Sequence, residues 1–95
     1  MITSTEKKSF KYLEVNSCAT EVLAERDYSK LRPKGRVDYH IIYITRGKCL
    51  LETADGETLE VKEGNIILFL PNVRQKYSFK GSDRSVSNYI HFSGT

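Results

Sequence analysis

Long apolar runs and cysteines are both scarce in this sequence, and each scarcity excludes a class of protein. No apolar run approaches the roughly 20 residues that a helix needs to cross a bilayer, and the polar residues 1–8 lack the apolar stretch of a secretory signal. The two cysteines, Cys18 and Cys49, are too few for a disulfide framework and lack CxxC spacing. We therefore expect a cytoplasmic protein without membrane contacts, in which both cysteines are reduced, buried and free of metal.

The sequence also lacks a strong charge of either sign, internal repeats and low-complexity segments. Its net charge is +3 over 95 residues, whereas nucleic-acid-binding domains concentrate Lys and Arg on one face. Hydrophobic residues make up 39% and charged residues 28%, which is typical of a folded globular chain. These values predict one small domain with no electrostatic sign of DNA binding.

What the sequence does contain is a series of short apolar runs separated by turn residues, without helical periodicity. Residues 39–44 are β-branched and aromatic and predict the strongest strand. Asp55-Gly56 lies between the strand-like residues 49–53 and 57–61, which predicts a hairpin. Residues 66–70 are nearly all apolar, so we expect a strand buried on both faces.

The remaining segments complete an all-β pattern. Pro33 and Gly35 predict a loop over residues 32–36, because proline fixes φ and glycine permits unusual φ. Further strands are expected at residues 10–15, 20–24, 73–79 and 85–92. This spacing is typical of a β-sandwich or β-barrel.

Three segments, taken in order, resemble the sensor domain of AraC-type transcription regulators. They are residues 38–47, which end in Thr-Arg-Gly; residues 63–71, which run from Glu-Gly to Leu-Pro; and residues 89–94, Tyr-Ile-His-Phe-Ser-Gly. The resemblance covers residues 10–95 and implies a cupin, a small jelly-roll-like β-barrel that binds an effector. It also implies a flexible arm over residues 1–9, which in some members folds over the ligand.

Members of this family continue with two dimerisation helices and a pair of helix-turn-helix motifs. Neither pattern occurs in the sequence, so we expect a fragment that reaches DNA only through a C-terminal domain outside this chain. The resemblance implies a ligand-sensing function, a small polar effector such as a sugar, and no enzymatic activity. A homodimer is also expected, since Val86, Ile90 and Phe92 would leave an apolar face uncovered.

The resemblance and the strand pattern together suggest a ligand site. Arg32 precedes Pro33 at the place where sugar-responsive members carry a ligand-binding arginine, although it could equally belong to a solvated basic loop. Tyr77 lies six residues after Pro71, where the family often has a pocket aromatic; the alternative is a core tyrosine. Tyr89 matches a position at which an aromatic ring stacks on the sugar.

Alternation along the last strand adds three more candidates. It places Ser87, Tyr89 and His91 on one face, which suits a polar pocket. His91 belongs to an aromatic-x-His-Phe signature, and a structural role is its alternative. His40 contributes a polar contact if its strand face looks inward.

Catalytic cupins hold a metal with a His-x-His pair, a glutamate and a distal histidine. The matching positions here are Asp38, His40, Thr45 and Gln75, and the last two are poor metal ligands. The sequence therefore predicts no metal and no cofactor, and a pairing of Cys49 with a histidine remains open. Two alternatives also remain, a free-standing metal-dependent cupin enzyme (an isomerase or dioxygenase) and a ligandless dimerisation module.

Overall fold

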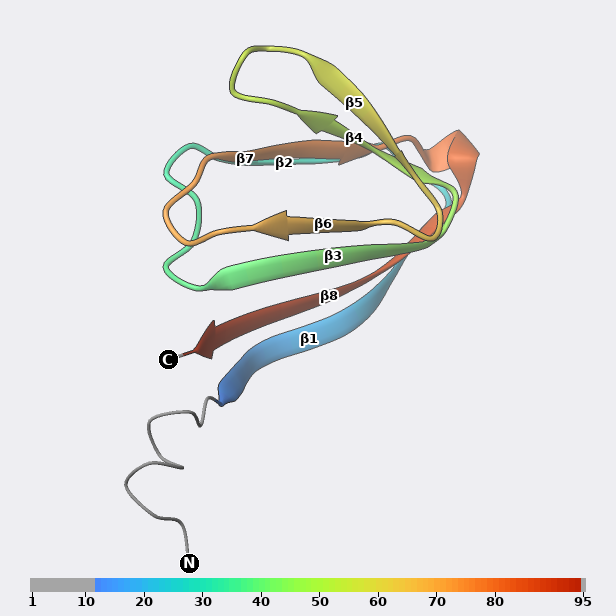
Figure 1. Ribbon diagram of the computed structural model, residues 1–95. Helices are drawn as coiled ribbons and strands as arrows, with labels where there is room; N and C mark the ends of the chain where they lie inside the picture. Colours follow the sequence, from blue (N-terminus) through green and yellow to red (C-terminus); the bar gives the residue numbers. More distant parts are fainter. Residues whose placement is uncertain (1–11, 95) are drawn as a thin grey trace, which may run out of the picture.

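The computed structural model describes residues 12–94, and the expected N-terminal arm, residues 1–9, lies outside them. The strands and the single short 3-10 helix of the described part are β1 Leu13–Leu23, β2 Tyr28–Arg32, β3 Tyr39–Arg46, β4 Lys48–Glu52, β5 Thr58–Lys62, β6 Ile66–Phe69, β7 Gln75–Phe79, the helix Gly81–Asp83, and β8 Ser85–Gly94 (Figure 1). No helix in this part of the chain is long and apolar enough to cross a membrane.

The strands form two four-stranded antiparallel sheets that lie against each other (Figure 1). One sheet has the order β1-β8-β3-β6 and the other β2-β7-β4-β5. Except for the hairpin of β4 and β5, strands next to each other in a sheet are not consecutive in sequence, as β1 and β8 show, which is the jelly-roll arrangement. The predicted all-β, jelly-roll-like architecture is confirmed.

Side chains that alternate along the strands fill the space between the sheets. In β3 the even-numbered residues Ile42 and Ile44 are buried, and their neighbours Tyr43 and Thr45 are exposed. The buried apolar cluster consists of Ile42, Ile44, Cys49, Ile67, Phe69, Tyr77 and Phe79. A period of two therefore decides which residues reach the interior.

The structure corrects the prediction that residues 66–70 are buried on both faces. Ile67 and Phe69 are buried, whereas Ile66 and Leu68 are 60% and 53% exposed. Strand β6 is at the edge of its sheet and only its inner face meets the other sheet. Its outer residues are paired in register with Tyr43 and with Ile41 of β3, so this face carries an apolar surface.

The N-terminal strands were also predicted incorrectly. Residues 13–23 form one long strand, β1, which pairs with β8 along its length and has an irregularity between Val15 and Ser17. Most of β1 is exposed, including Cys18, so the prediction that both cysteines are buried is wrong for one of them. Strand β2 was not predicted at all, and Arg32 is its last residue rather than part of a loop.

Candidate functional site

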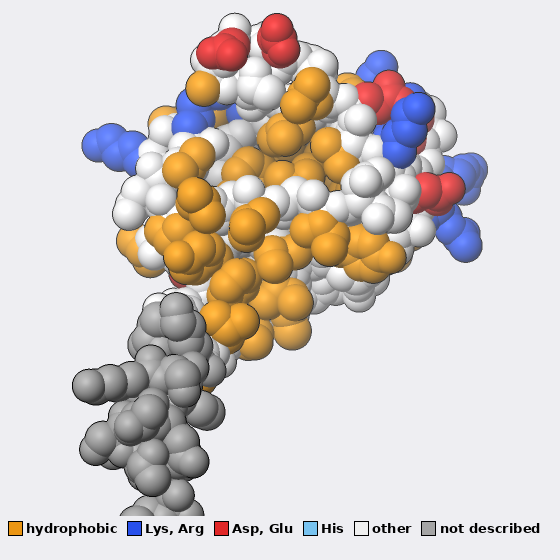
Figure 2. Space-filling view, in the orientation of Figure 1, with side chains coloured by type: hydrophobic (Ala, Val, Ile, Leu, Met, Phe, Trp, Pro, Cys, Tyr) orange, Lys and Arg blue, Asp and Glu red, His pale blue; other side chains and the backbone are white. Residues whose placement is uncertain are grey.

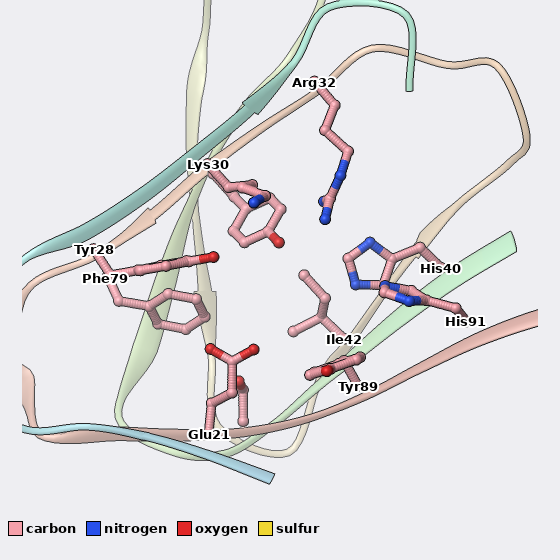
Figure 3. Close-up of a pocket in the computed structure, with 11 residues that line it drawn as sticks. Glu21, Tyr28, Lys30, Arg32, His40, Ile42, Phe79, Tyr89 and His91 are labelled. Carbon is pink, nitrogen blue, oxygen red and sulfur yellow. The ribbon is translucent and has the colours of Figure 1, made fainter. Parts of the chain in front are cut away.

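A cavity of about 180 Å³ lies between the two sheets (Figure 3). Its walls come from five strands and combine charged, aromatic and small polar groups. They are Glu21, Tyr28, Lys30, Arg32, His40, Ile42, Tyr77, Phe79, Ser87, Tyr89 and His91.

Alternation along β2 and β8 supplies the two opposite walls of this cavity. Tyr28, Lys30 and Arg32 occupy every second position of β2 and share its inner face. Ser87, Tyr89 and His91 do the same in β8, as the sequence predicts. Because each set stands on a paired strand, the backbone fixes the spacing of the side chains.

A buried network anchors Arg32 at one end of the cavity. Arg32 Nη1 donates to Oε1 of Gln75 at 3.0 Å, and Nδ1 of His40 lies 3.1 Å from the same oxygen. Arginine only donates, so the atom of Gln75 that faces it must be the carbonyl oxygen. Gln75 has no exposed surface, and the network therefore presets the position of the guanidinium.

The hydrogen bond to Gln75 also determines which ring nitrogen of His40 carries the proton. Since Oε1 of Gln75 accepts, Nδ1 of His40 must donate, which leaves Nε2 as an acceptor. His40 is only 2% exposed, and burial lowers its pKa to about 4, although the hydrogen bond to Gln75 opposes this shift. His40 is therefore neutral at pH 7.

Aromatic rings surround His40 and line the cavity beside it. The ring centroids of His40 and His91 are 4.3 Å apart, and those of Tyr89 and His91 are 4.9 Å apart. Nδ1 of His91 lies 2.8 Å from the hydroxyl oxygen of Ser17. Burial also lowers the pKa of His91, and the nearby charge of Arg36 lowers it further. These contacts combine flat faces with neutral hydrogen-bonding nitrogens.

All six predicted site residues, Arg32, His40, Tyr77, Ser87, Tyr89 and His91, line this one cavity. Their roles toward a ligand remain predictions. The alternative environment for Arg32, a solvated basic loop, is not what the structure shows, since Arg32 is half-buried and bonded to Gln75.

Five further lining residues were missed: Glu21, Tyr28, Lys30, Ile42 and Phe79. Spacing by two from Arg32 would have identified Tyr28 and Lys30 once β2 was recognised. Glu21 lies within the strand expected at residues 20–24, but neither face of that strand was assigned to the site. Ile42 and Phe79 are members of the apolar core and carry no polar signal.

Of the four positions that match the metal-binding residues of catalytic cupins, only His40 and Gln75 contact each other here. Asp38 is bound by Arg36 at 2.7 Å and by Asn16 at 2.9 Å, and these partners lower its pKa to about 2. The hydroxyl of Thr45 donates to the backbone oxygen of Val86. Within residues 12–94, no three His, Cys, Asp or Glu side chains are grouped so that they could hold a metal ion.

The sequence left open a catalytic pairing of Cys49 with a histidine. It has no exposed surface, and burial raises its pKa to about 12, so it carries no thiolate at neutral pH. Cys49 belongs to the apolar cluster and does not line the cavity. The site can thus bind and orient a polar molecule, but it offers no activated thiol.

Comparisons with solved structures support the fold assignment. The cupin domain of an XRE family transcriptional regulator from Enterobacter cloacae superposes with a TM-score of 0.57 at 12% identity, covering 87% of this chain and 95% of that one. ToxT from Vibrio cholerae, solved with a bound unsaturated fatty acid, gives 0.57 at 20% identity over 85% of this chain and 28% of its own. EutQ from Clostridium difficile gives 0.56 at 15% identity, over 87% of this chain and 68% of that one. These similarities show the cupin-like fold.

A search of curated proteins gives no match. The family model for the AraC-like ligand binding domain, in contrast, matches residues 18–95. This segment contains every residue that lines the cavity. Because the match spans most of the sequence, the chain belongs to the family of AraC-like ligand-binding domains.

Proposed function

We propose that this domain senses a small polar effector, a sugar, in the cavity between its sheets. The observation that carries the proposal is the preset guanidinium of Arg32 opposite the ring of Tyr89 across a cavity of about 180 Å³ (Figure 3). Sugars need polar groups for their hydroxyls and flat faces for their C–H surface. The walls of the cavity supply both.

The size of the cavity also favours a small ligand. Drug-sized ligands usually occupy sites of at least ~300 Å³, and this cavity is smaller. ToxT was solved with a fatty acid. Here, charged and polar groups such as Glu21, Lys30 and Ser87 line the cavity and favour a compact hydrophilic molecule over a long acyl chain.

The effector regulates transcription because its binding is coupled to a change between two states of the domain. A ligand that binds one state of the domain more tightly shifts the population toward that state. We propose that a DNA-binding domain on the same protein responds to this shift, and that the protein acts in the cytoplasm without catalysing a reaction. The jelly-roll chain described here then serves as the input domain.

A homodimer forms part of this proposal. Ile41, Leu68 and Ile90 are in register across three neighbouring strands, and Leu68 and Ile90 are exposed on the outer face of that sheet. Figure 2 shows hydrophobic side chains gathered over the visible face, with charged groups toward its margins. Sedimentation of the chain at increasing concentration should show a dimer, and Leu68→Glu should keep it monomeric.

The test of the ligand site is a thermal-shift screen with simple sugars. A binding sugar should raise the melting temperature, and Arg32→Ala should abolish that shift. Arg46→Ala, which removes an exposed arginine outside the cavity, is the matched control and should respond like the wild type. An unchanged shift in Arg32→Ala would contradict the assigned site, and bound stoichiometric metal with turnover would favour an enzyme instead.

A further inference from the structure

The cavity contains charged side chains that form no ion pair within the part of the chain that the structure describes. The ion pairs among residues 12–94 join Arg36 to Asp38, Lys48 to Glu60, and both Arg74 and Lys76 to Glu52. None of them includes Arg32, Lys30 or Glu21, the three charged residues that line the cavity. The unpaired charges of this part of the chain therefore include both basic residues of the site.

The side chain that holds Arg32 is neutral. Gln75 orients the guanidinium but does not neutralise it. Half-buried cations are normally stabilised by an anion, because desolvation penalises an uncompensated charge. Asp38 pairs with Arg36 and forms no ion pair with Arg32 among residues 12–94.

The positive and negative charges lie on opposite sides of the cavity. Arg32 and Lys30 enter the cavity from β2, and Glu21 enters it from β1 on the opposite side (Figure 3). The cavity walls thus carry two positive charges and one negative charge. A ligand with one negative charge balances the set, provided that its anionic group lies at the β2 side.

We propose that the effector is a sugar acid whose carboxylate binds between the guanidinium of Arg32 and the ammonium of Lys30. Carboxylates match the planar donor fork of arginine, and charge-assisted hydrogen bonds are stronger than neutral ones. The hydroxyl groups then lie toward Glu21 and Ser87, and the ring packs on Tyr89. This inference rests on the proposed function and narrows its ligand from sugars to acidic sugars.

The experiment compares sugars that differ only in the carboxylate. D-glucuronate is paired with D-glucose and D-galacturonate with D-galactose, and D-gluconate adds an open-chain acid. Melting temperature and calorimetric titration are measured on the full chain, with octanoate as a carboxylate that lacks hydroxyls. We expect at least one acid to bind tenfold or more tightly than its neutral partner and tighter than octanoate.

Variants at Lys30 separate charge recognition from folding. Lys30→Gln should weaken binding of the preferred acid about tenfold, as expected for the loss of one charge-assisted contact, and Lys30→Glu should weaken it further. Lys62→Gln, an exposed lysine on β5, is the control and should bind like the wild type. The unliganded melting temperature of each variant verifies that it folds.

The outcomes distinguish the two proposals. If neutral sugars bind as tightly as the acids, or Lys30→Gln leaves acid binding unchanged, the sugar-acid inference is wrong and the sugar-sensing proposal stands. If octanoate binds more tightly than every sugar acid, the inference is also wrong. If no sugar of either kind binds, both proposals fail.

Discussion

The interior of this domain has two regions that differ although alternation along the strands builds both. Between β3 and β6 on one sheet and β4 and β5 on the other, the inward residues include Ile44, Cys49 and Ile67, and the space is filled. Between β1, β8 and the first half of β3 on one side and β2 and β7 on the other, they include Arg32, His40 and Tyr89, and a cavity remains. We call these the packed region and the cavity region. Backbone geometry decides which side chains point inward, and their chemistry decides whether the space is a core or a site.

The largest effect should come from truncating the packed region. Ile44 has no exposed surface, so Ile44→Ala loses apolar burial and leaves a void that its neighbours fill only in part. We expect the free energy of unfolding to fall by about 3–4 kcal/mol. Urea denaturation measures this free energy. The control is Tyr43→Ala, which truncates an exposed side chain on the outer face and should lower the free energy of unfolding much less. A loss for Ile44→Ala no greater than that of Tyr43→Ala would contradict the assignment of the packed region.

A smaller effect should come from acidification, through His40 in the cavity region. The pKa of His40 is about 4 in the folded protein, below its ordinary 6.5, so the unfolded chain takes up the proton first. The contribution of His40 to stability should therefore be constant above pH 6.5, fall by up to about 3 kcal/mol as the pH drops from 6.5 to 4, and level off below that.

The slope of unfolding free energy against pH tests this expectation. His40→Gln removes the titrating group and should flatten most of the slope between pH 6.5 and 4. His91 is the only other histidine of the sequence and its pKa is also lowered, so the double variant should lose more of the slope than His40→Gln alone. A wild-type stability that does not change over this range would show that His40 is accessible to protons in the folded state.

These two regions were not equally predictable from sequence. Ser87, Tyr89 and His91 were assigned to one face because their strand alternates regularly between polar and apolar residues. Strand β2 was missed because three of its five residues are Lys, Arg or Ser, and its inward residues include the charged groups of the cavity. A functional face thus removes the apolar alternation that strand prediction needs.

The opposite error occurred at the surface. Ile66 and Leu68 are as apolar as Ile67, and no local feature distinguishes an outward apolar residue from an inward one. Only the sheet order, with β6 at an edge, separates the two faces. Sequence thus predicted the fold class and the cavity positions on β8, but not the long β1, the short β2 or the exposed face of β6.

Removing Arg36 and removing Arg32 should lower the stability of the protein by different amounts. Arg36 binds the buried carboxylate of Asp38, so Arg36→Ala should cost about 2 kcal/mol by leaving that charge without its main partner. Arg32→Ala should cost less than about 1 kcal/mol without ligand, because Oε1 of Gln75 keeps its contact with His40. Chemical denaturation of both variants compares the two costs.

The pH dependence of the stability lost in Arg36→Ala tests the pairing of Arg36 with Asp38 independently. The pKa of Asp38 is about 2, below its ordinary 3.8, so its pairing stabilises the fold above pH 3.8 and is lost as the pH falls toward 2. The difference between the wild type and Arg36→Ala should shrink over that interval. A larger loss for Arg32→Ala than for Arg36→Ala would mean that Arg32 is structural, which would weaken its assignment to the ligand site.

The smallest effect should come from the outer face of β6. Leu68 is 53% exposed, and Leu68→Ser removes little apolar burial from a single chain, so stability at low concentration should change by no more than about 0.5 kcal/mol. Ile67→Ser, one residue earlier on the inner face, should be strongly destabilising because it places a hydroxyl in the apolar cluster. If Leu68→Ser becomes costly only at high protein concentration, the stabilisation comes from the proposed dimer, since association contributes to stability by mass action. A large cost at every concentration would mean instead that this face is covered within one chain, which its exposure in residues 12–94 argues against.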